Sequence, residues 1–166
     1  MKIENLIVGD LATNCYLLSI NEECIIIDPG DEFSKIKKAV KDKKVVGCLL
    51  THFHFDHIGA LEEVLSYYDL EINKVKSNNF CFEIIQTSGH TSDSKTFYFP
   101  KDKIMFTGDF IFNHSIGRTD LGGSDEDMKN SLAKFKQYDD DIILYPGHGP
   151  STILKKEKKL FDLYYN

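Results

Sequence analysis

Short apolar runs recur along the chain, and Gly, Pro, Asn and Asp residues separate most of them. Runs rich in Val, Ile and Leu that are bounded by turn residues favour β-strands. Between several of these runs, apolar residues recur every three or four positions, which is the period of an amphipathic helix. The pattern predicts strands at 2–8, 15–20, 24–28, 45–50, 80–87, 95–99, 103–107 and 141–145.

Four helices are predicted between or after these strands, at 33–42, 58–67, 124–138 and 151–164. Ser124 is placed to cap the third helix, and the acidic residues after it favour the positive end of the helix dipole. Ser151 or Thr152 is expected to cap the fourth. The chain contains no linker, repeat or low-complexity tract, so we predict one mixed α/β domain over 1–166.

Composition narrows the classes of function. The 166 residues are 42% hydrophobic and 28% charged, which is ordinary for a globular protein that buries a core. The net charge of −6 argues against nucleic acid as the main partner, which would favour a basic face. We find neither a membrane-spanning run nor a signal peptide. The four cysteines, Cys15, Cys24, Cys48 and Cys81, form no C-x-x-C pair, and each lies in an apolar, strand-like context. We therefore expect buried free thiols and a reducing cytoplasm.

The densest chemical signal is the stretch 51–59, which reads T-H-F-H-F-D-H-I-G. Imidazole and carboxylate groups suit zinc and neighbouring divalent metals. In an extended segment alternate side chains point the same way, so we expect His52, His54 and Asp56 to share one face. His57 breaks the alternation and must point elsewhere. The stretch therefore favours two adjacent metal sites over one.

Further candidate ligands follow other predicted strands. His90, Asp109 and His148 each lie just past a strand in a Gly-containing loop, as His52 does. Loops held by a rigid sheet are typical positions for functional groups. Ligands at four strand ends can converge on one rim. His114 shows no such pattern, and we leave it out.

Two other polar residues have structural explanations beside functional ones. Asp28, in I-I-I-D-P-G, is expected to form a turn or to orient a metal-binding imidazole. Arg118 is the only arginine and lies in the polar loop S-I-G-R-T-D. We expect it to pair with Asp120 or with a loop carbonyl, and the alternative is a contact with substrate.

Together these motifs resemble the metallo-β-lactamase superfamily, and within it the glyoxalase II-like branch, in a short form without the C-terminal helical domain of larger enzymes. The blocks keep their order over nearly the whole chain, although the segment 58–89 is shorter than is usual in this branch. The resemblance rests on T-N-C-Y-L at 13–17, D-P-G at 28–30, H-x-H-x-D-H at 52–57, G-H-T at 89–91, G-D at 108–109, S-I-G-R-T-D at 115–120 and P-G-H-G-P at 146–150.

The resemblance implies a four-layer αβ/βα sandwich with a metal site at the common edge of two mixed sheets. It implies two divalent ions, zinc first and iron or manganese as alternatives, with Asp56 and Asp109 at the reacting centre. By the family pattern the first ion is held by His52, His54 and His90, the second by Asp56, His57 and His148, and Asp109 bridges both.

A two-metal site favours hydrolysis, because two ions about 3.5–4 Å apart lower the pKa of water toward about 7 and polarise an acyl carbonyl. A thioester releases a thiolate, so no separate acid is needed. We therefore predict a cytoplasmic thioesterase of glyoxalase II type, acting on a small acyl thioester such as S-D-lactoylglutathione. The alternatives are a mononuclear iron persulfide dioxygenase, a phosphodiesterase or nuclease, and a non-catalytic metal-binding domain. β-Lactam cleavage is less expected, because Asp109 stands where some β-lactamases carry a cysteine.

Overall fold

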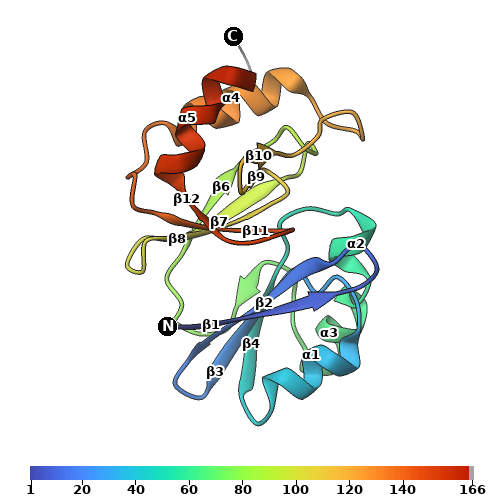
Figure 1. The fold of residues 1–166 in the computed structure, drawn as a ribbon. Coiled ribbons are helices and arrows are strands. Elements are labelled where there is room, and N and C mark those ends of the chain that lie inside the picture. The colour runs from blue at the N-terminus through green and yellow to red at the C-terminus, as the bar shows by residue number, and fades with distance from the viewer. Residues whose placement is uncertain (165–166) are drawn as a thin grey trace. The chain divides into compact units, whose positions relative to one another are not determined.

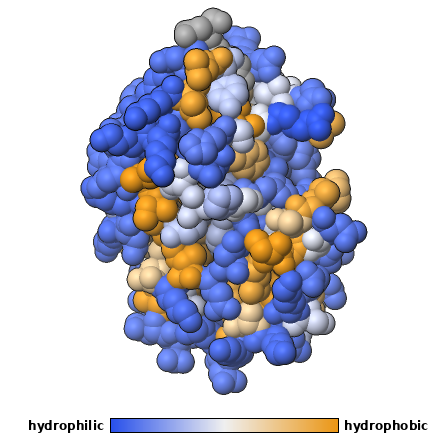
Figure 2. Space-filling model, viewed as in Figure 1, coloured by the Kyte–Doolittle hydropathy of each residue, from blue (hydrophilic) through white to orange (hydrophobic). Residues whose placement is uncertain are grey.

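The computed structural model describes residues 1–164, which form two compact units divided between Cys81 and Phe82 (Figure 1). Each unit is built on one five-stranded mixed sheet with helices packed against it. The single domain predicted over 1–166 stays a prediction. None of the helices among residues 1–164 is long and apolar enough to cross a bilayer. The face drawn in Figure 2 is largely hydrophilic, with apolar side chains in small groups between the polar ones.

The sheet of the first unit has the strand order β1-β2-β3-β4-β5, in which β3 and β4 run parallel and the other pairs antiparallel. Helices α1 and α3 pack on it through residues such as Ile36, Val40 and Val64, because their apolar positions recur at helical spacing. The elements are β1 (Lys2–Val8), β2 (Thr13–Ile20), β3 (Glu23–Ile27), α1 (Phe33–Val40), β4 (Lys44–Leu49), α2 (Phe55–Ile58), α3 (Leu61–Tyr68) and β5 (Lys74–Val75).

The sheet of the second unit has the order β12-β11-β8-β7-β6, in which only β11 and β8 run parallel. Helices α4 and α5 cover it through Met128, Phe135 and Phe161. The elements are β6 (Glu83–Gln86), β7 (Lys95–Phe99), β8 (Ile104–Gly108), β9 (Ile111–Phe112), β10 (Ser115–Ile116), α4 (Asp125–Phe135), β11 (Ile143–Pro146), β12 (Thr152–Ile153) and α5 (Leu154–Tyr164). Strands β9 and β10 form a separate two-stranded sheet.

Most predicted elements are confirmed with small shifts at their ends. The Ser124 cap is confirmed, since its hydroxyl accepts a hydrogen bond from the Asp127 amide over 3.2 Å. Thr152 is not a helix cap, because it pairs with Leu144 in strand β12. The helix predicted over 58–67 is divided into α2 and α3, with Ala60 outside helical geometry between them.

The burial expected for one cysteine is wrong. Cys15, Cys24 and Cys48 are buried free thiols, whereas Cys81 is exposed. The apolar run around Cys81 enters its strand only at Glu83, so the thiol lies in the preceding loop and has no sheet face to pack on.

Candidate metal centre

The loop after β4 and the short helix α2 carry four of the predicted ligands. His52 packs against two other imidazoles, with ring centroids 4.8 Å from His54 and 4.2 Å from His57. The chain is extended at His54 and becomes helical at Phe55. The shared face expected for an extended segment is therefore wrong for Asp56, which lies in α2. The helical turn, and not strand alternation, sets the directions of Asp56 and His57.

The buried side chain of Asp28 holds this loop in place through hydrogen bonds. Asp28 is 2% exposed, and its carboxylate accepts hydrogen bonds from the Thr51 amide at 2.8 Å and the Thr51 hydroxyl at 2.7 Å. It also accepts one from Nδ1 of His57 at 2.9 Å. The expectation that Asp28 orients an imidazole of the motif is confirmed. The motif thus rests on a residue that lies at the end of β3, far from it in sequence.

The hydrogen bonds fix which nitrogen of each ring carries the proton. The single hydroxyl proton of Thr51 is donated to Asp28, so Thr51 Oγ1 accepts from Nδ1 of His52 over 3.1 Å. Asp28 as a carboxylate can only accept, so Nδ1 of His57 carries a proton too. In both rings the lone pair is then on Nε2, the nitrogen available to a metal.

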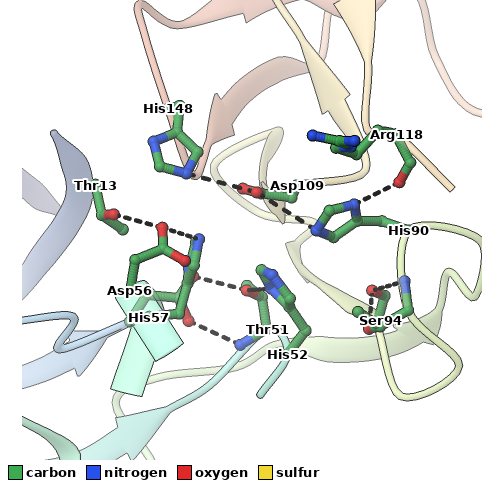
Figure 3. A network of polar contacts seen from close by, with 12 residues as sticks. Thr13, Thr51, His52, Asp56, His57, His90, Ser94, Asp109, Arg118 and His148 are labelled. Atoms are coloured by element: carbon green, nitrogen blue, oxygen red, sulfur yellow. Dashed lines mark hydrogen bonds and ion pairs between the residues drawn. The ribbon is translucent and has the colours of Figure 1, made fainter. Parts of the chain in front are cut away.

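Asp56 is held by the N-terminal hairpin. Its Oδ2 accepts a hydrogen bond from the Thr13 hydroxyl over 2.8 Å and lies 3.5 Å from Nε2 of His57 (Figure 3). The turn at 28–30 packs directly beneath: a Cβ on Gly30 would lie 1.9 Å from the Asp56 carbonyl oxygen. One on Gly59 would lie 2.3 Å from the carbonyl of Gly30. The two glycines allow the D-P-G turn and α2 to interlock.

The second unit holds the other three predicted ligands, each just past a strand end. One oxygen of Asp109, Oδ2, lies 3.6 Å from Nε2 of His90 and 3.5 Å from Nε2 of His148 (Figure 3). Two ligand atoms on one tetrahedral ion at 2.0–2.2 Å lie roughly 3.3–3.6 Å apart. The separations therefore fit ligands that share an ion, and one carboxylate oxygen stands at this separation from two imidazoles.

The loop that carries His90 is fixed by polar contacts. His90 donates from Nδ1 to the carbonyl oxygen of Arg118 over 2.6 Å, which again leaves Nε2 for a metal. The hydroxyls of Thr91 and Ser94 are bonded at 2.7 Å across the same turn. A Cβ on Gly117 would lie 1.8 Å from the Asp109 carbonyl oxygen, so the glycine of S-I-G-R lets the two loops approach.

The side chain of Arg118 forms a fork with Asp120, with Nε and Nη2 each 2.6 Å from a carboxylate oxygen. The guanidinium lowers the pKa of Asp120 to about 2. The expected structural pairing is confirmed. A contact between Arg118 and substrate stays a prediction. The sequence did not predict the role of the Arg118 carbonyl or of the Thr13 and Thr51 hydroxyls. For the two threonines, their position inside the motifs at 13–17 and 51–59 was the available signal.

In each unit the donor atoms are imidazole nitrogens and carboxylate oxygens, the set that suits zinc, iron or manganese. The side chains present fit a divalent metal. The assignment of all seven to one centre stays a prediction. His114, left out of the ligand set, lies in the turn between β9 and β10, where its amide bonds to Glu157 at 3.0 Å.

The fold and these motifs define a metallo-hydrolase. The family model of the metallo-beta-lactamase superfamily matches residues 8–78 and 78–148, and the chain belongs to this superfamily. It has the metallo-β-lactamase fold, mixed α/β with two mixed sheets. It is 30% identical to the "Probable metallo-hydrolase YqgX" of Bacillus subtilis, over 95% of each protein.

Two further proteins are similar over almost their whole length. The "Hydroxyacylglutathione hydrolase GloC" of Haemophilus influenzae is 30% identical over 96% of each protein. The crystal structure of the BLEG-1 B3 metallo-beta-lactamase superposes with a TM-score of 0.90 and 26% identity, over 99% of this chain and 100% of that one. These names share hydrolysis as the reaction type and span more than one substrate class. The likeness therefore supports a metallo-hydrolase without giving its substrate.

Proposed function

We propose that the chain is a dinuclear metal-dependent thioesterase of glyoxalase II type, acting on a small acyl thioester. The observation that carries the proposal is the position of Asp109 Oδ2, at ligand separation from the imidazoles of both His90 and His148. A single oxygen in this position suits a bridge between two ions. The likeness to GloC supports a thioester as substrate.

In the proposed centre, His52, His54 and His90 would hold the first ion, Asp56, His57 and His148 would hold the second, and Asp109 would bridge them. The motif resemblance and the family membership support this assignment. When bound, the ions, with zinc first and iron or manganese as alternatives, supply hydroxide at neutral pH and polarise the acyl carbonyl.

The chain's own residues set up this chemistry. Asp28 and Thr51 hold His52 and His57 in the tautomers that present Nε2, and the Arg118 carbonyl does the same for His90. Thr13 fixes one oxygen of Asp56. Asp56 and Asp109 supply the negative charges of the donor set. The thiolate leaves without a proton, so the mechanism asks no further acid of the protein.

We propose a small molecule as the partner and the cytoplasm as the location, since acyl thioesters of cellular thiols form there. The net charge of −6 argues against nucleic acid. A second candidate, β-lactam hydrolysis, is favoured by the superposition with BLEG-1. It is ranked lower because GloC, at the higher identity, points to thioesters.

The decisive experiment combines metal content with a substrate screen. The protein is stripped with a chelator, reloaded with zinc, iron or manganese, and assayed against thioesters with a thiol reagent. His54→Ala should abolish turnover, whereas His114→Ala, which changes a histidine outside the donor set, should retain it. Turnover that survives complete metal removal, or that is unchanged in His54→Ala, would overturn the proposal.

The same preparation separates the alternatives. Oxygen uptake with a persulfide and one iron per chain would identify a dioxygenase. Cleavage of bis-p-nitrophenyl phosphate would identify a phosphodiesterase, and cleavage of a chromogenic cephalosporin a β-lactamase. A fully metallated protein that turns over none of these would be a metal-binding domain without catalysis.

A further inference from the structure

A carboxylate that the proposed mechanism does not use lies buried in the second unit. Glu157, in the first turn of α5, is 1% exposed. Glutamate is rarely buried without hydrogen bonds, because it is costly to take a charge out of water. Its Oε1 accepts a hydrogen bond from the Thr152 hydroxyl at 2.5 Å, and its Oε2 accepts one from the His114 amide at 3.0 Å. Glu157 therefore joins two segments that are distant in the sequence.

The first segment is the loop 147–151, which carries His148 from β11 to β12. Its first amide donates to the carbonyl oxygen of the last residue of β8 over 2.8 Å, and this bond fixes where the loop begins. The loop ends at β12, a strand of only two residues that offers few ladder hydrogen bonds. Thr152, in this strand, is buried, and its bond to Glu157 adds a fixed point at the end of the loop.

The second segment is the β9–β10 hairpin. Its base adjoins two groups of the proposed centre, since Asp109 precedes β9 and Arg118, whose carbonyl holds His90, follows β10. Its tip is the turn at His114, where φ is 65°. This left-handed conformation is uncommon outside glycine and persists where the surroundings hold it. The bond to Glu157 supplies such a hold through the backbone of His114, so a change of the imidazole leaves the bond in place.

The two segments also meet at the imidazole of His148. The ring of Phe112, in β9, has its centroid 6.2 Å from that of His148. Hairpin and loop form the walls of a cavity of about 290 Å³, and Glu157 binds both of these segments. The lining consists of Phe112, Asn113, Ser115, His148, Gly149 and Pro150.

Resting on the proposed metal centre, we propose that Glu157 is a positioning residue for the ligands of the second unit. Its carboxylate holds the tip of the hairpin and the end of the loop together, and this sets where Asp109 and His148 present their donor atoms. Those atoms, Oδ2 and Nε2, lie 3.5 Å apart, which suits ligands of one ion (Figure 3). Without Glu157 the hairpin and the loop can move independently, so metal binding should weaken although every ligand is still present.

Two substitutions at Glu157 separate hydrogen bonding from the filling of space. Leucine accepts no hydrogen bond, so Glu157→Leu breaks both links. Glutamine keeps an oxygen that can accept from the His114 amide, and its NH₂ group can donate to the Thr152 oxygen, so Glu157→Gln should retain both. Lys158→Met is the matched control, because Lys158 ties the same helix to Asp140 at 2.9 Å, outside both segments.

Zinc affinity, measured by competition with a chelator, is the functional readout. Glu157→Leu should weaken zinc binding about tenfold, the lower end of the effect of losing a group that orients a ligand. Glu157→Gln and Lys158→Met should bind zinc as tightly as the parent. Unchanged zinc binding in Glu157→Leu would overturn the inference. An equal loss in Lys158→Met would overturn it too, because the effect would then come from the docking of α5 in general.

Amide hydrogen exchange tests the link itself, without metal or substrate. The His114 amide should exchange slowly in the metal-free parent and in Glu157→Gln. It should exchange about 10–100-fold faster in Glu157→Leu, because a hydrogen bond to a charged group is lost. Equal rates in the parent and the leucine variant would contradict the link.

A milder variant covers the case in which Glu157→Leu does not fold. Thr152→Val removes one of the two links and should cause a smaller loss of zinc affinity, and an unchanged affinity would count against the inference. If the parent binds zinc but hydrolyses no thioester, the proposed function fails while the zinc measurements still decide the role of Glu157. A parent that binds no zinc would overturn both.

Discussion

The buried carboxylate of Asp28 accepts a hydrogen bond from Nδ1 of His57 over 2.9 Å, and this contact ties the end of β3 to the histidine motif. The same oxygen, Oδ2, also accepts from the Thr51 hydroxyl, which in turn accepts from His52. One carboxylate therefore orients an imidazole proposed for each of the two ions. Its removal should weaken both sites together.

Asp28→Ala is expected to lower the affinity for both metal ions by about 10–100-fold, because outer carboxylates hold ligating imidazoles in position. The buried donors left behind should also lower the free energy of unfolding by about 1–3 kcal/mol for each group left unsatisfied. Competition with a chelator measures the first effect and urea denaturation the second. Loss of only one ion, with the other bound normally, would contradict the shared role.

Thr51→Val and Thr51→Ser form a matched pair. Valine keeps the shape but removes the hydroxyl that links Asp28 to His52, so it should cost about 1–3 kcal/mol of stability and reduce metal affinity. Serine keeps the hydroxyl and should retain most of both. Nitrogen NMR of the metal-free protein should show His52 protonated on Nδ1 in the parent and a tautomer mixture in the valine variant. The same tautomer in both would remove the reason given for Thr51.

Gly30→Ala should destabilise the first unit strongly, because its Cβ would lie 1.9 Å from the Asp56 carbonyl oxygen. The loss should exceed about 3 kcal/mol, since backbone must shift to relieve the clash. Gly122→Ala is the comparison: Gly122 has φ +88° but nothing within 4 Å of an added Cβ. It should cost only the conformational strain, about 1–3 kcal/mol. Thermal and urea unfolding measure both variants.

Arg118→Gln tests whether the side chain or the backbone of Arg118 serves the site. Metal affinity should be unchanged, because His90 is held by the Arg118 carbonyl. The pKa of Asp120 should rise from about 2 toward its usual range, since the guanidinium that lowers it is gone. In the parent, the lowered pKa of Asp120 stabilises the folded state at pH values above the pKa of this carboxyl in the unfolded chain. This stabilisation is lost as the pH falls toward 2. Carbon NMR of the carboxyl group follows the titration, and an increase in KM alone would show a contact with substrate.

Thiol chemistry should distinguish the cysteines. One thiol per chain, Cys81, should react rapidly with a disulfide reagent in the native protein, and three more should react after unfolding. Burial raises the pKa of Cys24 to about 11 and also raises those of Cys15 and Cys48, so these thiols should remain unreactive even at pH 9. Rapid reaction of more than one native thiol would contradict this pattern.

Local pattern was enough to place most of the elements. Strands such as Lys95–Phe99 are apolar and bounded by turn residues, and that signal is contained within a few positions. The two-residue strands β9 and β12 were not predicted, because pairing with a partner strand defines them more than their composition does. The break between α2 and α3 was not predicted either, since the helical spacing of apolar residues continues across it.

The sequence by itself determined the family, the order of the elements and which side chains have metal-binding chemistry, because H-x-H-x-D-H and the strand-end motifs are local patterns. Tertiary structure decided what supports them. Asp28 contacts Thr51 and His57, Arg118 offers a carbonyl to His90, and Asp109 directs one oxygen to two imidazoles. These contacts join residues far apart in the chain, and their geometry depends on how strands and loops pack. Residue spacing carries no information about that packing.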